Sequence, residues 1–107
     1  MPVDLLNLSA TGVLMEVPSA VRPGSTCDLT ATLAGIPFGA LVRITRCRAG
    51  GVASDEHGGR VLVYQAGCEF VALAADQKLN LSRAIEKIGG AKLASQSSAF
   101  LKAVKSR

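Results

Sequence analysis

Strict alternation of apolar and polar residues is the feature that most restricts what this chain can fold into. In residues 26–33, TCDLTATL, every second side chain is apolar, and these are Cys27, Leu29, Ala31 and Leu33. A period of two places one face of a β-strand against a core and leaves the other face in water. A surface helix would instead carry apolar side chains three and four positions apart. The segment is therefore predicted to be a β-strand.

Further strand-like runs fill the first two-thirds of the chain. They are VDLLNL and VLMEV at residues 3–8 and 13–17, IPFGALVRITRCR at residues 36–48 and VLVYQAGCEFVAL at residues 61–73. Turn signals separate them, including Pro23-Gly24 and Ala34-Gly35. About five strands in succession, with no helix between them, favour an antiparallel barrel or sandwich over a parallel sheet. We expect an all-β fold.

One stretch between the last two strands has the composition of a loop. From Ala49 to Arg60 there are four glycines, together with Ser54, Asp55, Glu56 and His57. Glycine, serine and acidic residues are the residues that turns favour. We predict that this stretch is a long loop that joins the two strands into an antiparallel hairpin.

Helical periodicity begins after the strands. Asp76 is placed as an N-cap and Gly89-Gly90 as a C-cap, and the apolar residues between them at helical spacing are Leu81, Ala84, Ile85 and Ile88. A second helix is predicted from about Lys92 to Lys105, although its serines are poor helix formers. The expected organisation is a barrel with its first helix over residues 1–90 and a basic helical tail over residues 91–107.

Length, hydropathy and charge exclude several classes of protein. A chain of 107 residues has the size of one domain. No apolar run approaches the roughly 20 residues that span a bilayer, and the N-terminus lacks a signal-peptide pattern, so we expect a soluble, cytoplasmic protein. Residues 1–75 carry a net charge of −1 and residues 76–107 one of +5. With four aromatic residues, and none interleaved with the positive charges, DNA or RNA binding is not predicted.

The residues that catalysis or metal binding would need are sparse. Cys27, Cys47 and Cys68 form no CxxC pair and His57 is the only histidine, so a zinc site is not predicted. The cysteines are interpreted as small buried apolar residues. His57 lies in the glycine-rich stretch rather than beside a nucleophile, and no glycine-rich phosphate-binding motif is present. We expect no enzymatic activity, no metal and no resident cofactor.

A polar hexapeptide, NLSATG at residues 7–12, joins the first two strand-like runs. Asn7 offers an amide that can donate and accept hydrogen bonds at once, and Ser9 adds a hydroxyl. Gly12 would allow a positive φ angle and the close approach of a flat ring or a phosphate. These residues form a candidate ligand-binding set. The alternative is that Asn7, Ser9 and Thr11 only bond local backbone groups and shape a tight connection.

At these residues the chain resembles the PilZ domains, which are bacterial receptors for the second messenger cyclic di-GMP. NLSATG fits the family motif D/N-x-S-x-x-G at Asn7, Ser9 and Gly12, and AGCEF is similar to the later GxxF segment through Gly67 and Phe70. The resemblance covers roughly residues 3–88. It implies an antiparallel PilZ-like β-barrel with one or two C-terminal α-helices and a signalling or adaptor role. It also implies that Asn7, Ser9 and Gly12 bind cyclic di-GMP.

The family's second element is an R-x-x-x-R pair upstream of the hexapeptide, and only six residues precede Asn7. Either the natural sequence is longer or the pair has been lost, so binding would be weak or would need the missing arginines. The arginines that could substitute are Arg22, Arg43, Arg46 and Arg48. A regular strand would place Arg43 on the face opposite Arg46 and Arg48, so at most part of this set is expected to meet one ligand. The simpler interpretation is that all four are solvated surface residues.

A second hypothesis describes a ligand-independent interaction or oligomerisation module with a degenerate nucleotide site. A PilZ barrel without its first strand would have an open edge, and such edges are usually covered or paired. The basic residues of the tail, which flank an apolar stripe, are Lys92, Lys102, Lys105 and Arg107. This hypothesis predicts a protein partner, or self-association through the C-terminal helix or the open barrel edge.

Overall fold

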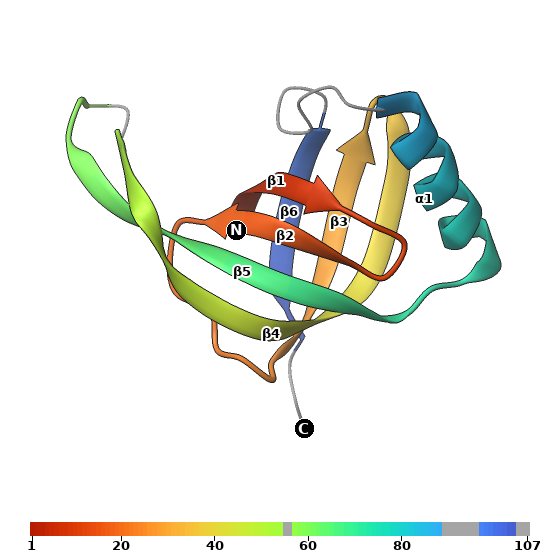
Figure 1. Ribbon diagram of the computed structural model, residues 1–107, viewed down its shortest axis with the longest axis horizontal. Coiled ribbons are helices and arrows are strands. Elements are labelled where there is room, and N and C mark those ends of the chain that lie inside the picture. Colours follow the sequence, from red (N-terminus) through yellow and green to blue (C-terminus); the bar gives the residue numbers. More distant parts are fainter. Residues whose placement is uncertain (55–56, 89–96, 105–107) are drawn as a thin grey trace.

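The computed structural model describes residues 1–54, 57–88 and 97–104. Within these residues the elements are β1 (Pro2–Leu8), β2 (Gly12–Val17), β3 (Thr26–Leu33), β4 (Ile36–Ser54), β5 (Arg60–Ala72), α1 (Ala75–Ile88) and β6 (Ser97–Ala103). The strands form a closed barrel in the order β1-β2-β5-β4-β3-β6, and each neighbouring pair is antiparallel (Figure 1). The predicted all-β barrel followed by a helix is confirmed.

The barrel closes through the C-terminal segment, which is a strand rather than the predicted second helix. β6 lies between β1 and β3, where Ala99 pairs with Val3 and Leu101 pairs with Leu29 (Figure 1). Leu101 is buried while Lys102 is exposed, so the segment alternates with the period of a strand. Hydrogen bonding to a strand on each side outweighs the weak helical pattern that the sequence shows. The expected open edge is therefore filled by β6.

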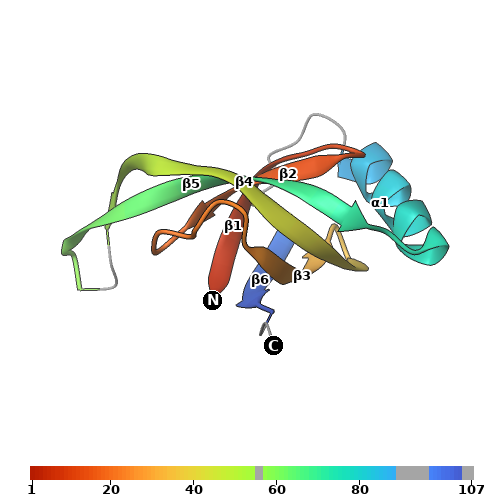
Figure 2. The ribbon, with the colours of Figure 1, turned by 90° about the horizontal axis from the view of Figure 1, so that it is seen from below.

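The predicted antiparallel hairpin between these strands is confirmed, but the extent of its loop, Ala49 to Arg60, is wrong, because β4 continues to Ser54 and β5 begins at Arg60. Together, residues 49–54 and 60–63 form a two-stranded ribbon that extends beyond the barrel, which we call the arm (Figures 1 and 2). Two of the four glycines, Gly50 and Gly51, lie at a β-bulge of β4, where Gly51 has a φ of 130°, whereas Gly58, with a φ of 78°, lies in the connection between β4 and β5. The first pair of glycines thus marks a bend in a strand rather than a loop.

The core of the barrel is made by the alternating side chains of all six strands. The predicted pattern in β3 is confirmed, since Cys27, Leu29 and Leu33 are buried and Asp28 and Thr30 are exposed. The remaining buried apolar residues of the strands include Val3, Leu5, Val13, Met15, Val17, Phe38, Val42, Ile44, Ala66, Cys68 and Leu101. These residues give the curved sheet one dry interior, and every large polar side chain that the structure describes lies outside it.

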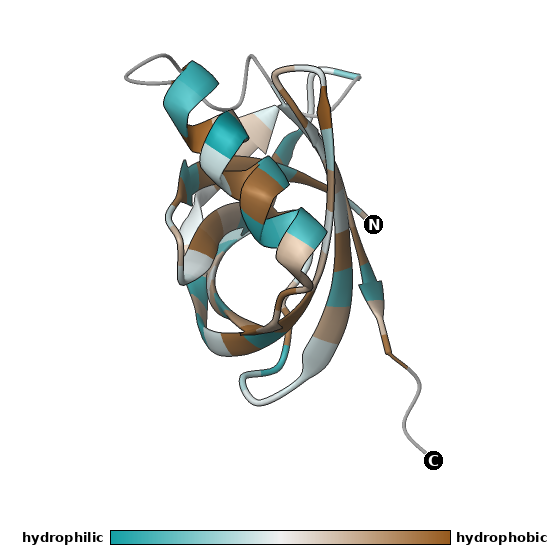
Figure 3. Cartoon of the chain, turned by 90° about the vertical axis from the view of Figure 1, so that its right-hand side faces the viewer, coloured by the Kyte–Doolittle hydropathy of each residue, from teal (hydrophilic) through white to brown (hydrophobic). Residues whose placement is uncertain are grey.

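α1 covers one end of the barrel with its apolar face, and hydrophobic and hydrophilic residues alternate along it (Figure 3). Its buried residues, Leu81, Ala84 and Ile88, are among those predicted from the helical spacing. Two polar contacts attach it to β4: Gln77 Oε1 accepts a bond from the Gly39 amide at 2.8 Å, and Asn80 Nδ2 donates to the Pro37 carbonyl at 3.1 Å.

The boundaries of α1 differ slightly from the prediction. The helix begins at Ala75, so Asp76 lies within its first turn, where its charge favours the helix dipole, rather than at the N-cap. The expected cap at Gly89-Gly90 lies outside the described residues, as do Lys92, Lys105 and Arg107. No helix in the described part of the chain is both long enough and apolar enough to cross a bilayer.

Candidate functional site

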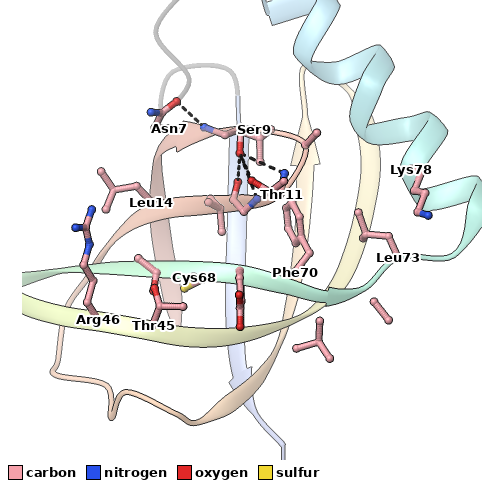
Figure 4. Close-up of a pocket in the computed structure, with 18 residues that line it drawn as sticks. Asn7, Ser9, Thr11, Leu14, Thr45, Arg46, Cys68, Phe70, Leu73 and Lys78 are labelled. Carbon is pink, nitrogen blue, oxygen red and sulfur yellow. Dashed lines mark hydrogen bonds between the residues drawn. The ribbon is translucent and has the colours of Figure 1, made fainter.

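The hexapeptide at residues 7–12 forms the tight connection between β1 and β2. The Ser9 amide donates to the Gly12 carbonyl at 3.0 Å, and the Ser9 hydroxyl accepts bonds from the amides of Thr11 and Gly12, each at 3.3 Å. The hydroxyls of Ser9 and Thr11 also lie 3.2 Å apart (Figure 4). Ser9 is exposed, yet its hydroxyl is committed to the turn. The local-bonding alternative therefore describes the contacts of Ser9 in this structure.

Asn7 keeps its donors available. Its Oδ1 atom accepts a bond from the Leu8 amide at 2.9 Å, and a β-bulge between Leu5 and Asn7 changes the register of β1 just before it. This bond assigns the amide so that Nδ2 faces outward, and Nδ2 has no partner among the described residues. The exposed side chain therefore offers two N–H groups at the rim of the turn.

Gly12 does not adopt the positive φ angle that the sequence suggested. The glycines with positive φ in the described residues are Gly24, Gly35, Gly51 and Gly58, so Gly12 does not use left-handed backbone. A Cβ atom at Gly12 would overlap the carbonyl oxygen of Cys68, because β2 and β5 pass very close together there. The Phe70 amide also donates to the Thr11 carbonyl at 2.9 Å. Gly12 thus lets the turn lie flat against β5.

A groove of about 830 Å³ lies beside this turn (Figure 4). Its walls are the hexapeptide itself, the bulged part of β4, the C-terminal half of β5 and the start of α1. The residues that these elements contribute besides residues 7–12 include Thr45, Arg46, Gly67, Glu69, Phe70, Leu73 and Lys78. Phe70, which the PilZ resemblance singled out, is half-buried and forms a T-shaped contact with the Phe38 ring at a centroid distance of 5.7 Å. The groove brings together segments that are far apart in the sequence.

A bulge in β4 gives the arginines an arrangement that a regular strand would not give. Arg43 pairs with Glu69, Ile44 with Cys68 and Arg46 with Gly67, so one additional residue of β4 lies between Ile44 and Arg46. Arg43 and Arg46 are consequently both exposed, rather than on opposite faces as predicted. Of the four arginines considered from the sequence, Arg46 lines the groove, whereas Arg22, Arg43 and Arg48 do not.

Of these two exposed arginines, Arg43 is paired with a carboxylate and Arg46 is not, within the described residues. Arg43 Nη1 lies 2.8 Å from Glu69 Oε1, and the two half-exposed side chains form an ion pair. Arg46 has no hydrogen-bond or ion-pair partner in the part of the chain that the structure describes. Its stem lies across Gly67, where an added Cβ atom would be 3.1 Å from both Cγ and Nε of Arg46.

The balance of charge in the groove is positive. Among the described residues, those that line the groove and carry a charge are Arg46, Lys78 and Glu69, and the carboxylate of Glu69 is already neutralised by Arg43. Cys68 also lines the groove, but burial raises the pKa of its thiol to about 12, so this residue adds no negative charge at neutral pH. The available groups are mainly donors, which suits an anionic ligand rich in acceptor atoms.

Sequence reasoning found the turn and named Arg46, Gly67 and Phe70, but it did not predict that they form the opposite wall of one groove, and it missed Lys78 and Glu69. The signal for that wall was Gly67, a single glycine inside a strand-like run, since such a glycine often marks a bulge or the close approach of another group. Among the described residues, no group of three or more His, Cys, Asp or Glu side chains is placed to hold a metal ion, and the three cysteines are free.

No protein-family model, curated protein or solved structure matches the chain. The resemblance to PilZ domains therefore depends on the motif residues and on their order along the chain.

Proposed function

We propose that the protein is a non-catalytic bacterial signalling domain of the PilZ type that binds cyclic di-GMP in the cytoplasm. The observation that carries this proposal is the exposed NLSATG turn at the rim of a donor-rich groove of about 830 Å³. A groove of this size is in the range of small-molecule sites. The ligand has two phosphate charges and many acceptor atoms, which complement the unpaired donors of Asn7, Arg46 and Lys78.

Within this proposal, Asn7 and Ser9 have separate tasks. Asn7 Nδ2 can donate to the acceptor atoms O6 and N7 of a guanine, whereas Ser9 holds the turn in shape through its bonds to Thr11 and Gly12. Ser9 is thus a positioning residue, and Gly12 keeps the turn against β5. Because Arg46 and Lys78 are the only cations among the described residues that line the groove, the affinity of this chain is expected to be modest.

Calorimetric titration with cyclic di-GMP tests the proposal. The unmodified protein should bind, Asn7→Ala should weaken binding, and Ser9→Ala should weaken it by loosening the turn. Ser82→Ala is the matched control, because Ser82 is an exposed serine of α1 that does not line the groove. Absence of heat from the unmodified protein, or equal affinities for Ser9→Ala and Ser82→Ala, would contradict the proposal.

One observation favours the second function, that of an interaction or oligomerisation module. The arm exposes large apolar side chains, with Val52 56% exposed, Leu62 49% and Val61 41%. Val52 and Leu62 are cross-strand partners and therefore share one face of the ribbon. Clustered exposed apolar residues are typical of surfaces that contact another protein. The two functions use different parts of the molecule and are compatible with each other.

A further inference from the structure

The groove contains one cation whose position is determined by the strands rather than by a flexible segment. Arg46 follows the bulge of β4, and its stem crosses β5 at Gly67 toward the wall formed by β2. In Figure 4, Arg46 and Lys78 lie at opposite ends of the groove with the hexapeptide turn between them. The backbone of Arg46 belongs to a paired strand of a closed barrel, which limits where its guanidinium can reach.

Gly67 is the residue that allows this placement. Any side chain at Gly67 would start 3.1 Å from Cγ and Nε of Arg46 and 3.4 Å from Oγ1 of Thr45. Thr45 Oγ1 also donates to the Gly67 carbonyl at 2.9 Å, which ties the bulge to β5. A bare α-carbon and a fixed bulge together hold the arginine stem flat against the sheet.

Arg46 and Arg43 differ in what a ligand would gain from each of them. The charge of Arg43 is satisfied by Glu69 at 2.8 Å, whereas the guanidinium of Arg46 is exposed and has no partner within the described residues. A planar guanidinium presents parallel N–H donors that match two oxygens of one phosphate. An arginine already ordered by its surroundings loses less side-chain entropy when such a phosphate binds.

We infer that Arg46 is the phosphate-binding residue of this groove, held in place by Gly67 and supplied by the barrel wall itself. The inference deepens the proposed function and rests on it for the identity of the ligand, because the phosphate is taken to belong to cyclic di-GMP. It assigns to β4 the cationic contact for which the sequence offered no upstream arginine pair.

Titration with two probes tests this assignment. Cyclic di-GMP binding is measured by calorimetry for the unmodified protein and for Arg46→Ala, Arg46→Lys and Arg48→Ala. Loss of a bidentate charged contact should reduce affinity about 10- to 100-fold in Arg46→Ala. Arg46→Lys should recover only part of that loss, because lysine keeps the charge without the two parallel donors. Arg48→Ala removes a neighbouring arginine outside the groove and should bind as the unmodified protein does.

A second titration uses inorganic pyrophosphate and monitors the NMR resonance of Arg46 Nε–Hε. It separates failure of this inference from failure of the proposed function. If cyclic di-GMP binds equally well to Arg46→Ala and the unmodified protein, the inference is overturned and the proposed function stands. If cyclic di-GMP does not bind but pyrophosphate shifts the Arg46 resonance, the anion site stands and the proposed ligand is wrong. If neither probe affects Arg46, both ideas are overturned.

Gly67→Ala provides an independent test that leaves every charge in place. The new methyl group would displace the stem of Arg46, so affinity for cyclic di-GMP should fall to a value between those of the unmodified protein and Arg46→Ala. Thermal unfolding checks that the variant remains folded. A folded Gly67→Ala protein with undiminished affinity would show that the position of Arg46 does not matter for binding.

Discussion

The backbone of Gly12 lies directly beside the Cys68 carbonyl at the point where β2 and β5 begin to pair. The nearest heavy atoms to an added Cβ all belong to the backbone of Cys68 and Glu69, so they cannot rotate away as the end of a side chain could. The fixed glycine of the hexapeptide motif thus has a structural requirement of its own. Its presence in the sequence is explained by strand packing, whether or not a ligand binds.

Gly12→Ala is therefore expected to lower the free energy of unfolding by about 1 to 3 kcal/mol, in the range of other overpacking substitutions. Gly39→Ala is the control, because a Cβ atom there has only Leu29 O nearby, at 3.9 Å. Gly39→Ala should change stability by less than about 0.5 kcal/mol. Urea unfolding of both variants provides the measurement, and equal stabilities would contradict the close approach of β2 and β5.

Burial also makes the stability of the protein depend on pH above the neutral range. The pKa of Cys68 is raised from 9.0 to about 12, chiefly by burial, and burial also raises the pKa of Cys27. Between pH 9 and about 12 the unfolded chain loses the Cys68 proton while the folded chain keeps it. The unfolded state then binds fewer protons, so the free energy of unfolding falls as pH rises, by up to about 1.4 kcal/mol per pH unit for this group.

Chemical unfolding of the unmodified protein and Cys68→Ala across that pH range checks the prediction. Subtracting the two curves removes the titration of lysine and tyrosine residues that they share. The slope should be shallower for Cys68→Ala, even though its stability at neutral pH is changed by the smaller side chain. Cys47→Ala keeps Cys68 and should retain the steep decline. Parallel curves for the unmodified protein and Cys68→Ala would contradict a strongly raised pKa.

At the scale of strands and helices, local sequence patterns correctly predicted the elements that keep a regular spacing of buried apolar residues in the folded barrel. The alternation in β3 and the helical spacing around Leu81 and Ala84 are visible in the sequence because each element buries one face. β6 was mistaken for a helix because SSAFLKA is short and its serines and alanines carry little periodic signal. Only its pairing with β1 and β3 determines its conformation, and pairing between segments distant in the chain is not encoded in a local pattern.

The candidate site likewise has one part that a local sequence pattern predicts and another part that depends on tertiary structure. The turn at residues 7–12 is a local structure, so its residue types could be recognised directly. Arg46 and Lys78 reach the groove only through a bulge and through the docking of α1. A bulge shifts every following side chain by one position, so the faces of Arg43 and Arg46 could not be read from a regular alternation.

The strand assignment of β6 makes a prediction about Leu101, which is 2% exposed. Truncation of a buried leucine to alanine should lower the free energy of unfolding by about 2 to 5 kcal/mol. Lys102→Ala, at the next position on the outer face, should change it by less than about 0.5 kcal/mol. Chemical unfolding of both variants distinguishes a strand of the barrel from a helical tail that packs weakly, because such a tail would tolerate both substitutions.

At the scale of the whole molecule, the arm makes the protein less compact than a barrel alone. The radius of gyration is 13.7 Å, compared with about 13 Å expected for a globular chain of this length. β5 is paired with β2 only from Tyr64 to Glu69, and β4 with β3 only from Ile36 to Arg43. Within the arm, each strand is therefore paired with the other alone, as far as the described residues extend. A two-stranded ribbon of this kind has marginal stability in water.

We expect the arm to be covered by a second copy of the chain, because an apolar ribbon with a free edge on each side can pair with its own symmetry mate. The unmodified protein should show a concentration-dependent dimer in sedimentation equilibrium, and the double variant Val52→Asp/Leu62→Asp should be monomeric. Charges on that face would be desolvated in a dimer but solvated in a monomer, so the substitutions should act on association more than on folding.

Leu79→Asp is the control, because Leu79 is 52% exposed on α1, outside the arm. A monomeric unmodified protein would exclude self-association through the arm, and a double variant that still dimerises would place the interface elsewhere. Cyclic di-GMP affinity should be unchanged in the monomeric variant, since no arm residue lines the groove and the two functions would then be carried by separate ends of the same pair of strands.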